Sequence, residues 1–164
     1  EAGATRDVLI LDVDAGTSEP LFETQATETA GSLSADGRWL AYDSSRTGVR
    51  EVYVRRFPDG DEIQVSTNNG QLPVWSTDGS ELFYQANLNR IFAAPFDAAS
   101  ETFSFEPLFV GAPFWLGIVG PAFDTGPDGR LLMVRHRDPT DPPDRLEVIV
   151  NFSERLKRLA PAAR

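Results

Sequence analysis

Short runs of alternating apolar and polar residues, separated by turns, follow one another along most of the 164-residue chain. A period of two residues is typical of a half-buried β-strand. Three of these runs, "RWLAY", "ELFYQ" and "RLLMV", begin directly after an Asp-Gly pair or one residue later. Gly accepts the positive φ of a tight hairpin turn, and Asp can bond to nearby backbone N–H groups. The sequence therefore predicts three hairpins, which turn at Asp36-Gly37, Asp78-Gly79 and Asp128-Gly129.

The three turns recur at a spacing that is typical of a repeat protein. Asp36, Asp78 and Asp128 lie 42 and 50 residues apart, and a period of about 40–50 residues suits a four-stranded propeller blade. Further strands are predicted at 7–13, 19–24, 51–57, 62–67, 90–96, 102–110 and 145–152. If the strands of a blade are lettered a to d from the inside outward, the chain reads c-d, a-b-c-d, a-b-c-d, a-b-c. We therefore expect an all-β, β-propeller-like fold of about three four-stranded blades.

The expected blades form one unit over residues 1–152. Its parts are a partial blade at 6–24, blades at 29–67 and 72–110, and a partial blade at 121–152. Closed propellers contain four to eight blades, so three are too few. We therefore expect either half of a roughly six-bladed propeller or a ring that is completed by oligomerisation through the first and last blades.

A short C-terminal helix and tail are expected at 153–164. Asn151 and Glu154 fit a capping box, and Phe152, Leu156 and Leu159 fall on one helical face. We expect this helix to dock on the rim of the propeller or to contact an acidic patch of another subunit.

Three segments of the chain resemble the WD40-like, TolB-type β-propeller repeats of bacteria: "SLSADGRWLAYDSSRTGVREVYVRRFP", "VWSTDGSELFY" and "LEVIVNFSERLKRL". The resemblance runs from about Asp7 to Leu159, and it is closest to the C-terminal part of propellers in larger proteins, some of them attached to serine/threonine kinase domains. Two turns depart from the usual repeat, with Ala35 where Pro is common and Gly126-Pro127 in place of Ser-Pro. The resemblance implies a propeller fold, and it favours an extracytoplasmic or periplasmic location without fixing one. It implies no specific activity, because propellers host many functions.

Composition narrows the range of partners. The formal net charge is −10 and the arginines are scattered, whereas binding to a phosphate backbone needs clustered Lys and Arg, so we expect no nucleic-acid partner. No run of 18 apolar residues is present, so we expect no membrane span. The first residues lack the features of a signal peptide, and Arg6 to Val13 already fits a strand. A secreted parent could have lost a signal peptide by processing, but the early strand favours a chain that begins within a longer protein.

The residues that could carry chemistry do not form a known constellation. His136 is the only histidine; a Ser-His-Asp relay would have to use it with Asp138 or Asp124, and no G-x-S-x-G motif occurs. The absence of cysteine excludes a thiol nucleophile and Cys-ligated zinc. The stretch "DVDAG" begins like a calcium loop but does not continue as one, and "DPTDPPD" leaves room only for a weak cation site. We predict no enzyme activity, no cofactor and no metal site.

Propeller topology sorts the loops to two faces. The Asp-Gly turns and the c–d turns share one face, and the longer, more varied b–c and d–a loops share the other, where function is often carried. The apolar run "PFWLGIVGP" on this second face is either buried between blades or forms a recognition surface. Trp39 and Trp75, in contrast, are expected in the core. The candidate binding residues are Arg50, Asn69, Phe114, Trp115, Arg135 and His136.

The sequence thus favours a noncatalytic propeller module for binding or scaffolding, which recognises an unidentified protein or small ligand. Two alternatives stay open. The chain could be the propeller portion of a hydrolase or peptidase, or the extracytoplasmic sensor domain of a bacterial serine/threonine kinase. Self-association, or further blades upstream, would complete the ring.

Overall fold

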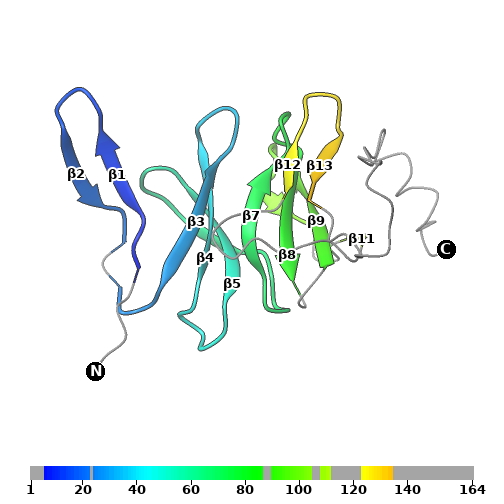
Figure 1. Ribbon diagram of the computed structural model, residues 1–164, viewed down its shortest axis with the longest axis horizontal. Helices are drawn as coiled ribbons and strands as arrows, with labels where there is room; N and C mark the ends of the chain where they lie inside the picture. The colour runs from blue at the N-terminus through cyan, green and yellow to red at the C-terminus, as the bar shows by residue number, and fades with distance from the viewer. Residues whose placement is uncertain (1–5, 23, 87–89, 105–107, 112–122, 135–164) are drawn as a thin grey trace, which may run out of the picture.

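The computed structural model describes residues 6–22, 24–86, 90–104, 108–111 and 123–134. Within these ranges the chain forms thirteen β-strands and no helix. The strands make four antiparallel sheets, which follow one another in chain order across the molecule (Figure 1). The predicted all-β, partial-propeller fold is therefore confirmed. No helix that could cross a membrane occurs in this described part of the chain.

In each of the two central sheets, four strands that are consecutive in the sequence lie side by side in the same order. The first sheet has the order β3-β4-β5-β6, with bounds β3 (Glu28–Leu33), β4 (Trp39–Ser44), β5 (Glu51–Arg56) and β6 (Glu62–Gln64). The second has the order β7-β8-β9-β10, with bounds β7 (Gln71–Trp75), β8 (Glu81–Ala86), β9 (Arg90–Asp97) and β10 (Thr102–Phe103). Two-stranded sheets flank them, formed by β1 (Leu9–Asp12) with β2 (Thr17–Pro20), and by β12 (Phe123–Thr125) with β13 (Leu131–Met133).

The outermost strand of the second central sheet differs from the expected single strand at 102–110. Both β10 and a further strand, β11 (Leu108–Gly111), pair with β9. Phe103 lies opposite Phe96, and Leu108 lies opposite Ala93. The chain therefore advances five residues from Phe103 to Leu108, while β9 advances only three from Ala93 to Phe96. Continuous pairing is therefore interrupted. Pro107 lies in the interval, and its lack of an N–H group is unfavourable in a ladder. The predicted strand 145–152 and helix 153–164 lie outside the described residues.

The three Asp-Gly turns share one hydrogen-bonding pattern. The glycines adopt φ values of +70° to +72°. In each turn the glycine N–H donates to the carbonyl of the residue three positions earlier, at 2.8 to 3.1 Å. The Asp Oδ1 accepts the N–H two residues onward, at 3.0 to 3.3 Å. The predicted hairpin turns are confirmed at Asp36-Gly37, Asp78-Gly79 and Asp128-Gly129.

Alternate residues of the central sheets are buried against different neighbours. On β4, Leu40 and Tyr42 pack toward the β1–β2 hairpin, whereas Trp39 and Ala41 pack against the next sheet. On β8, the side chains of Leu82, Tyr84 and Ala86 join that same cluster, and Phe83 packs against β12 and β13. The first strands of successive sheets also contact one another, β3 with β7 and β7 with β12. The sheets are therefore stacked face to face, as blades are, and do not continue into one flat sheet.

The tryptophans predicted for the core lie there. Trp39 is 5% exposed and Trp75 is 4% exposed. Their rings meet the ring of Phe96 edge-on, at centroid distances of 5.3 and 5.4 Å. This aromatic group joins the two central sheets.

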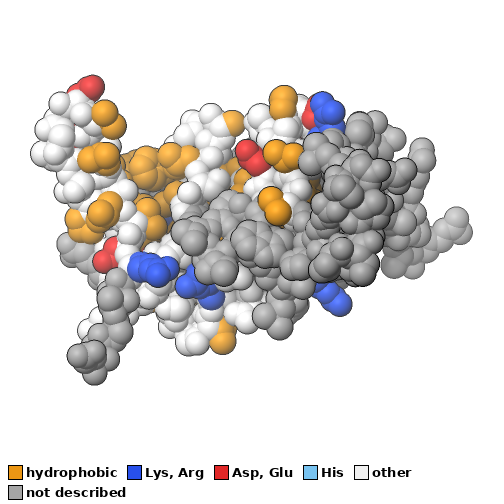
Figure 2. All heavy atoms as spheres, in the orientation of Figure 1, with side chains coloured by type: hydrophobic (Ala, Val, Ile, Leu, Met, Phe, Trp, Pro, Cys, Tyr) orange, Lys and Arg blue, Asp and Glu red, His pale blue; other side chains and the backbone are white. Residues whose placement is uncertain are grey.

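The end sheets carry exposed apolar side chains. Leu9, Leu11 and Val13 are 58%, 63% and 81% exposed, and Leu132 and Val134 are about half exposed. Figure 2 shows hydrophobic side chains on the hairpin at the left, where Figure 1 places β1 and β2. The predicted association through the first and last blades stays a prediction, and these faces are what it would cover. Light scattering after size-exclusion chromatography tests it: we expect oligomers that dissociate on dilution, and a monomer at every concentration would contradict it.

Burial between the central sheets should dominate stability. We expect Leu82→Ala to lower the free energy of unfolding by about 2–5 kcal/mol, because it opens a cavity at a fully buried position. Urea unfolding followed by tryptophan fluorescence measures the change. Val49→Ala is the matched control, since Val49 is exposed and lies outside the end sheets, and we expect it to change stability by less than about 1 kcal/mol. Equal effects of the two substitutions would contradict the proposed stacking.

Candidate functional site

The loops opposite the Asp-Gly turns form one face of the molecule. Their described residues are 21–22 and 24–27 between β2 and β3, 45–50 between β4 and β5, and 65–70 between β6 and β7. We call them the loop face. In Figure 1 the β4–β5 loop lies at the lower edge and the Asp-Gly turns lie at the upper edge. Three buried carboxylates support this face: Glu28, Asp43 and Glu51, which are 1%, 0% and 3% exposed.

Asp43 links the two central sheets. Its Oδ1 accepts a hydrogen bond from Thr29 Oγ1 at 2.7 Å and lies 3.3 Å from Arg50 Nη1. Its Oδ2 accepts the N–H of Leu72, in the neighbouring sheet, at 3.0 Å. Leu72 has a φ of +54° within a β-bulge of β7, and this bulge directs its N–H away from the β8 ladder. The carboxylate thus holds two blades and the base of the β4–β5 loop together.

The environment of Asp43 raises its pKa. Removal of the carboxylate from water is the largest cause, and the hydrogen bonds from Leu72 and Thr29 and the charge of Arg50 offset only part of it.

Glu51 holds the β6–β7 loop. Its carboxylate accepts hydrogen bonds from Ser66 Oγ, from the N–H of Asn69 at 3.0 Å and from the N–H of Gly70 at 3.2 Å. Asn69 adopts a left-handed φ of 67°, which points its N–H inward. The negative charge of Glu51 also adds to the effect of burial on Tyr84, whose pKa is raised to about 12. The loop conformation therefore depends on a carboxylate that lies beneath it.

Glu28 and Arg46 fix the two remaining loops. Glu28 Oε1 accepts from Thr24 Oγ1 at 2.8 Å and from Ser44 Oγ at 3.0 Å, while its Oε2 is buried without a partner among the described residues. Arg46 pairs with Glu62 on β6, and its guanidinium lies 4.0 Å from the centre of the Tyr53 ring. Both loops are therefore connected to the sheets by charged or hydrogen-bonded side chains.

Two of the six predicted binding residues lie on the loop face within the described chain. Arg50 is partly exposed, and its Nη1 donates to Thr29 Oγ1 at 3.1 Å. Asn69 is exposed and lies on the adjacent loop. The structure therefore places both beside the buried carboxylates. Phe114, Trp115, Arg135 and His136 lie outside the described residues.

The carboxylates themselves were missed by sequence reasoning. Their signal was a charged residue at the end of an otherwise apolar strand, as in "LAYDSS" for Asp43 and "EVYVRR" for Glu51. A lone acid at a strand end usually faces water, so burial could not be inferred from the pattern alone.

The hydrogen bonds of the buried carboxylates limit the roles that these side chains can have. The carboxylates of Asp43 and Glu51 each accept at least three contacts from protein donors. Among the described residues, no three His, Cys, Asp or Glu side chains are grouped closely enough to hold a metal ion. The arrangement can therefore position loops and present Arg50 and Asn69 at the surface.

Solved structures with a similar fold were found, although no protein-family model and no curated protein matches the chain. TolB from Acinetobacter baumannii is 16% identical, with a TM-score of 0.50; the match covers 81% of this chain and 43% of that one. Oligogalacturonate lyase from Vibrio parahaemolyticus is also 16% identical, with a TM-score of 0.50 and coverage of 79% and 38%. A protein of Agrobacterium tumefaciens assigned as TolB is 20% identical, with a TM-score of 0.49 and coverage of 66% and 46%.

At these identities the two matches with a TM-score of 0.50 show the fold alone, which is a TolB-type β-propeller fold. The resemblance seen in the repeats is confirmed at this level. The chain spans less than half the length of each of the three proteins.

The raised pKa of Asp43 predicts how stability depends on pH. As the pH rises above 3.8, the ordinary pKa of an aspartate, the unfolded chain releases the Asp43 proton at a lower pH than the folded chain does. The contribution of this group to stability is therefore present below pH 3.8 and is lost as the pH rises through the folded-state pKa. Urea unfolding of the wild type and Asp43→Asn between pH 3 and 7 isolates this effect. We expect the stability difference, wild type minus variant, to fall as the pH rises.

Asp78→Asn is the matched control for that measurement. Hydrogen bonds from Ser80 and Ser76 lower the pKa of Asp78. Its contribution is therefore present above pH 3.8 and is lost as the pH falls, so its difference curve should slope in the opposite direction. A difference for Asp43→Asn that rises with pH would contradict the prediction.

Proposed function

We propose that this chain is a noncatalytic β-propeller binding module that recognises a protein or ligand through its loop face. The observation that carries the proposal is the pair of buried carboxylates, Asp43 and Glu51, which accept hydrogen bonds from the loops and from the strands at the base of the loops. Burying a charge is costly unless it is paired and hydrogen-bonded, so these groups stabilise particular loop conformations. A surface that is ordered before it meets its partner loses less conformational freedom on binding.

Arg50 is the side chain on this face that we expect to contribute most to binding. Its Nη1 is anchored by Asp43 and Thr29, and about a third of the side chain is exposed. A guanidinium has five N–H donors, so donors beyond those on the anchored nitrogen can meet carboxylate or carbonyl acceptors of a partner. Arginine is also enriched among the residues that dominate interfaces.

Binding measurements test the role of the loop face. Partners would first be captured on the intact chain by cross-linking and identified by mass spectrometry, and their dissociation constants then measured with purified proteins. We expect Arg50→Ala to weaken binding by at least about fivefold, because it removes a large group of a type that anchors interfaces. Arg38→Ala, beside an Asp-Gly turn on the opposite edge, should leave the dissociation constant unchanged. Equal affinities for all variants would reject the loop face as the binding surface.

An enzymatic role is the alternative, since a lyase is among the proteins that share the fold. Peptide, ester and oligogalacturonate substrates incubated with the chain would detect it. We expect no turnover above that of heat-denatured protein. Turnover that is abolished by His136→Ala or Asp43→Asn, in a variant that remains folded, would overturn the noncatalytic proposal.

A further inference from the structure

The two end hairpins each lack a strand that the complete blades have. In the central sheets the second strand of the Asp-Gly hairpin pairs with the next strand of the chain, as β4 does with β5 and β8 does with β9. Within the described chain, β13 is paired only with β12, and β1 only with β2. Figure 1 shows these two hairpins at opposite ends of the row of sheets. Each end therefore carries an open strand edge at a point where a complete blade continues.

The β1–β2 hairpin corresponds to the two outer strands of a complete blade. Asp12 lies opposite Thr17 across its turn, as Asp97 lies opposite Thr102 across the turn between β9 and β10. In both turns the Asp Oδ1 accepts the backbone N–H two residues onward, at 3.0 and 2.9 Å. Asp12 therefore corresponds to Asp97, and the preceding residues of β1 correspond to those of β9.

The β12–β13 hairpin corresponds to the two inner strands of a complete blade, with a turn that is one residue shorter. A backbone hydrogen bond closes this turn over four positions, from Gly126 to Arg130, and closes the preceding turn over five. Leu131 is the first strand residue to pair after the turn, as Leu82 is in the preceding hairpin. Leu131 therefore corresponds to Leu82.

These equivalences explain the exposed apolar side chains of β1. Leu9 and Leu11 correspond to Ala94 and Phe96, which are buried against the preceding sheet. Val8, on the other face, packs against the following sheet. The hairpin thus has the following neighbour of a blade, and within the described chain it lacks the preceding one.

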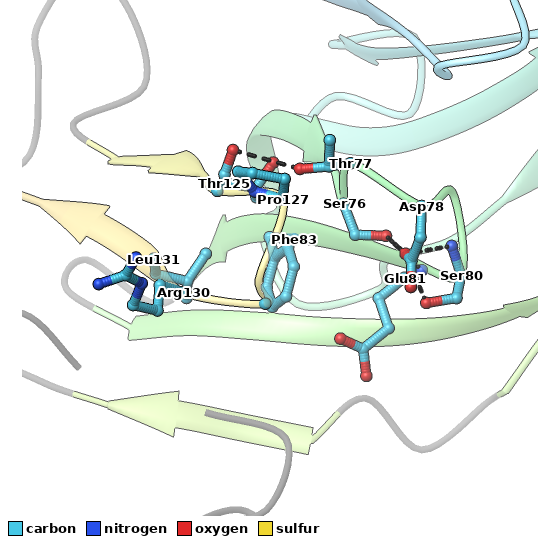
Figure 3. Close-up of a pocket in the computed structure, with 12 residues that line it drawn as sticks. Ser76, Thr77, Asp78, Ser80, Glu81, Phe83, Thr125, Pro127, Arg130 and Leu131 are labelled. Carbon is cyan, nitrogen blue, oxygen red and sulfur yellow. Dashed lines mark hydrogen bonds between the residues drawn. The ribbon is translucent and has the colours of Figure 1, made fainter. Parts of the chain in front are cut away.

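The β13 strand has the opposite defect. Leu131 and Met133 pack with Phe83 of the preceding sheet, and Figure 3 shows Leu131 and Phe83 on neighbouring strands. Leu132 corresponds to Phe83, which in its own blade is buried against the following sheet, yet Leu132 is exposed. Each end hairpin therefore supplies the strands and the covering sheet that the other one needs.

We propose that the β12–β13 hairpin of one copy and the β1–β2 hairpin of a second copy form one shared blade, in the order β12-β13-β1-β2. The sheet of the first copy that contains β7 to β11 covers the face with Leu9 and Leu11. The sheet of the second copy that contains β3 to β6 covers the face with Leu132. Two copies then form four complete and two shared blades, and six blades lie within the range of closed propellers.

The pairing of β8 with β9 specifies the register of the shared blade. In that pair Leu82 lies opposite Ala94, and the next residue of β8 lies opposite Ala93. The corresponding pairs between the copies, with the β13 residue given first, are Leu131 with Leu9 and Leu132 with Val8.

Disulfide formation between singly substituted chains tests the shared blade, because the chain has no cysteine of its own. Val8→Cys and Leu132→Cys chains would be prepared separately, mixed in equal amounts and oxidised. Opposite residues of an antiparallel pair have Cα atoms about 4.5–5.5 Å apart, which a disulfide can span. We expect the mixture to give at least about tenfold more disulfide-linked dimer than either chain oxidised alone.

Val49→Cys is the matched control for the cross-link, since Val49 is also exposed but lies on the loop face. Mixed with Val8→Cys, it should form no more linked dimer than the chains oxidised alone. Mass spectrometry of the digested dimer identifies which two cysteines are joined.

Light scattering over a dilution series measures the association itself. Leu11→Glu places a carboxylate on a side chain that is exposed in one copy and buried in the shared blade. We expect it to raise the dimer dissociation constant at least about tenfold, because burying an unpaired charge is unfavourable. Val49→Glu is the charge-matched control and should leave the constant unchanged. Circular dichroism checks that both variants are folded, which their exposed positions favour.

Three results would each overturn the shared blade: monomers at every concentration, a Leu11→Glu chain that associates as the wild type does, or no more linked dimer with Leu132→Cys than with Val49→Cys. The last result is expected if the predicted strand 145–152 pairs with β13, or if the copies meet through another surface. The loop face takes no part in these contacts, so the proposed function and the shared blade can fail separately.

Discussion

The structure depends on burial of both faces of its central sheets. Leu40 and Tyr42 face one neighbour and Trp39 and Ala41 face the other, so β4 cannot be stable unless sheets lie on both sides of it. The same holds for β8, where Leu82 and Phe83 point to different clusters. Face-to-face stacking follows from this constraint, because a single continuous sheet would leave one of these apolar faces in water. The end sheets need the same cover on both faces. Their exposed apolar residues show that one face stays uncovered within the described chain.

Stacking also determines where polar groups can be placed. At the loop end of each junction the backbone leaves the ladders, and buried N–H groups need other acceptors. Asp43 meets this need across the junction between the central sheets, by accepting the N–H of Leu72 from the neighbouring bulge. Glu51 does the same within the β6–β7 loop. The carboxylates under the loop face are therefore part of the architecture, and they give the loops the fixed shape that the proposed binding function uses.

The repeats are alike in backbone and differ in what fills the space between them. The Asp-Gly turns have nearly identical geometry, and β3 and β7 carry one bulge each at positions 42 residues apart. The side chains that cross the junctions are free to change within this constant frame. At the next junction, where Glu81 and Thr125 stand at the positions of the Trp pair, a pocket lies between the sheets (Figure 3).

The sequence by itself determined the all-β class, the turns at the three Asp-Gly pairs and the core positions of Trp39 and Trp75, and the spacing of the turns indicated blades. These are local properties, because a period of two and a residue that accepts positive φ act over a few neighbouring positions. It also indicated the face that carries Arg50 and Asn69, since loop order follows from strand order. It could not indicate that Asp43 and Glu51 are buried, because their partners Leu72 and Asn69 lie 29 and 18 residues away. Only the tertiary structure decided those contacts, the split of β10 from β11 and the pocket at Glu81, because each depends on which side chain of a neighbouring blade lies opposite.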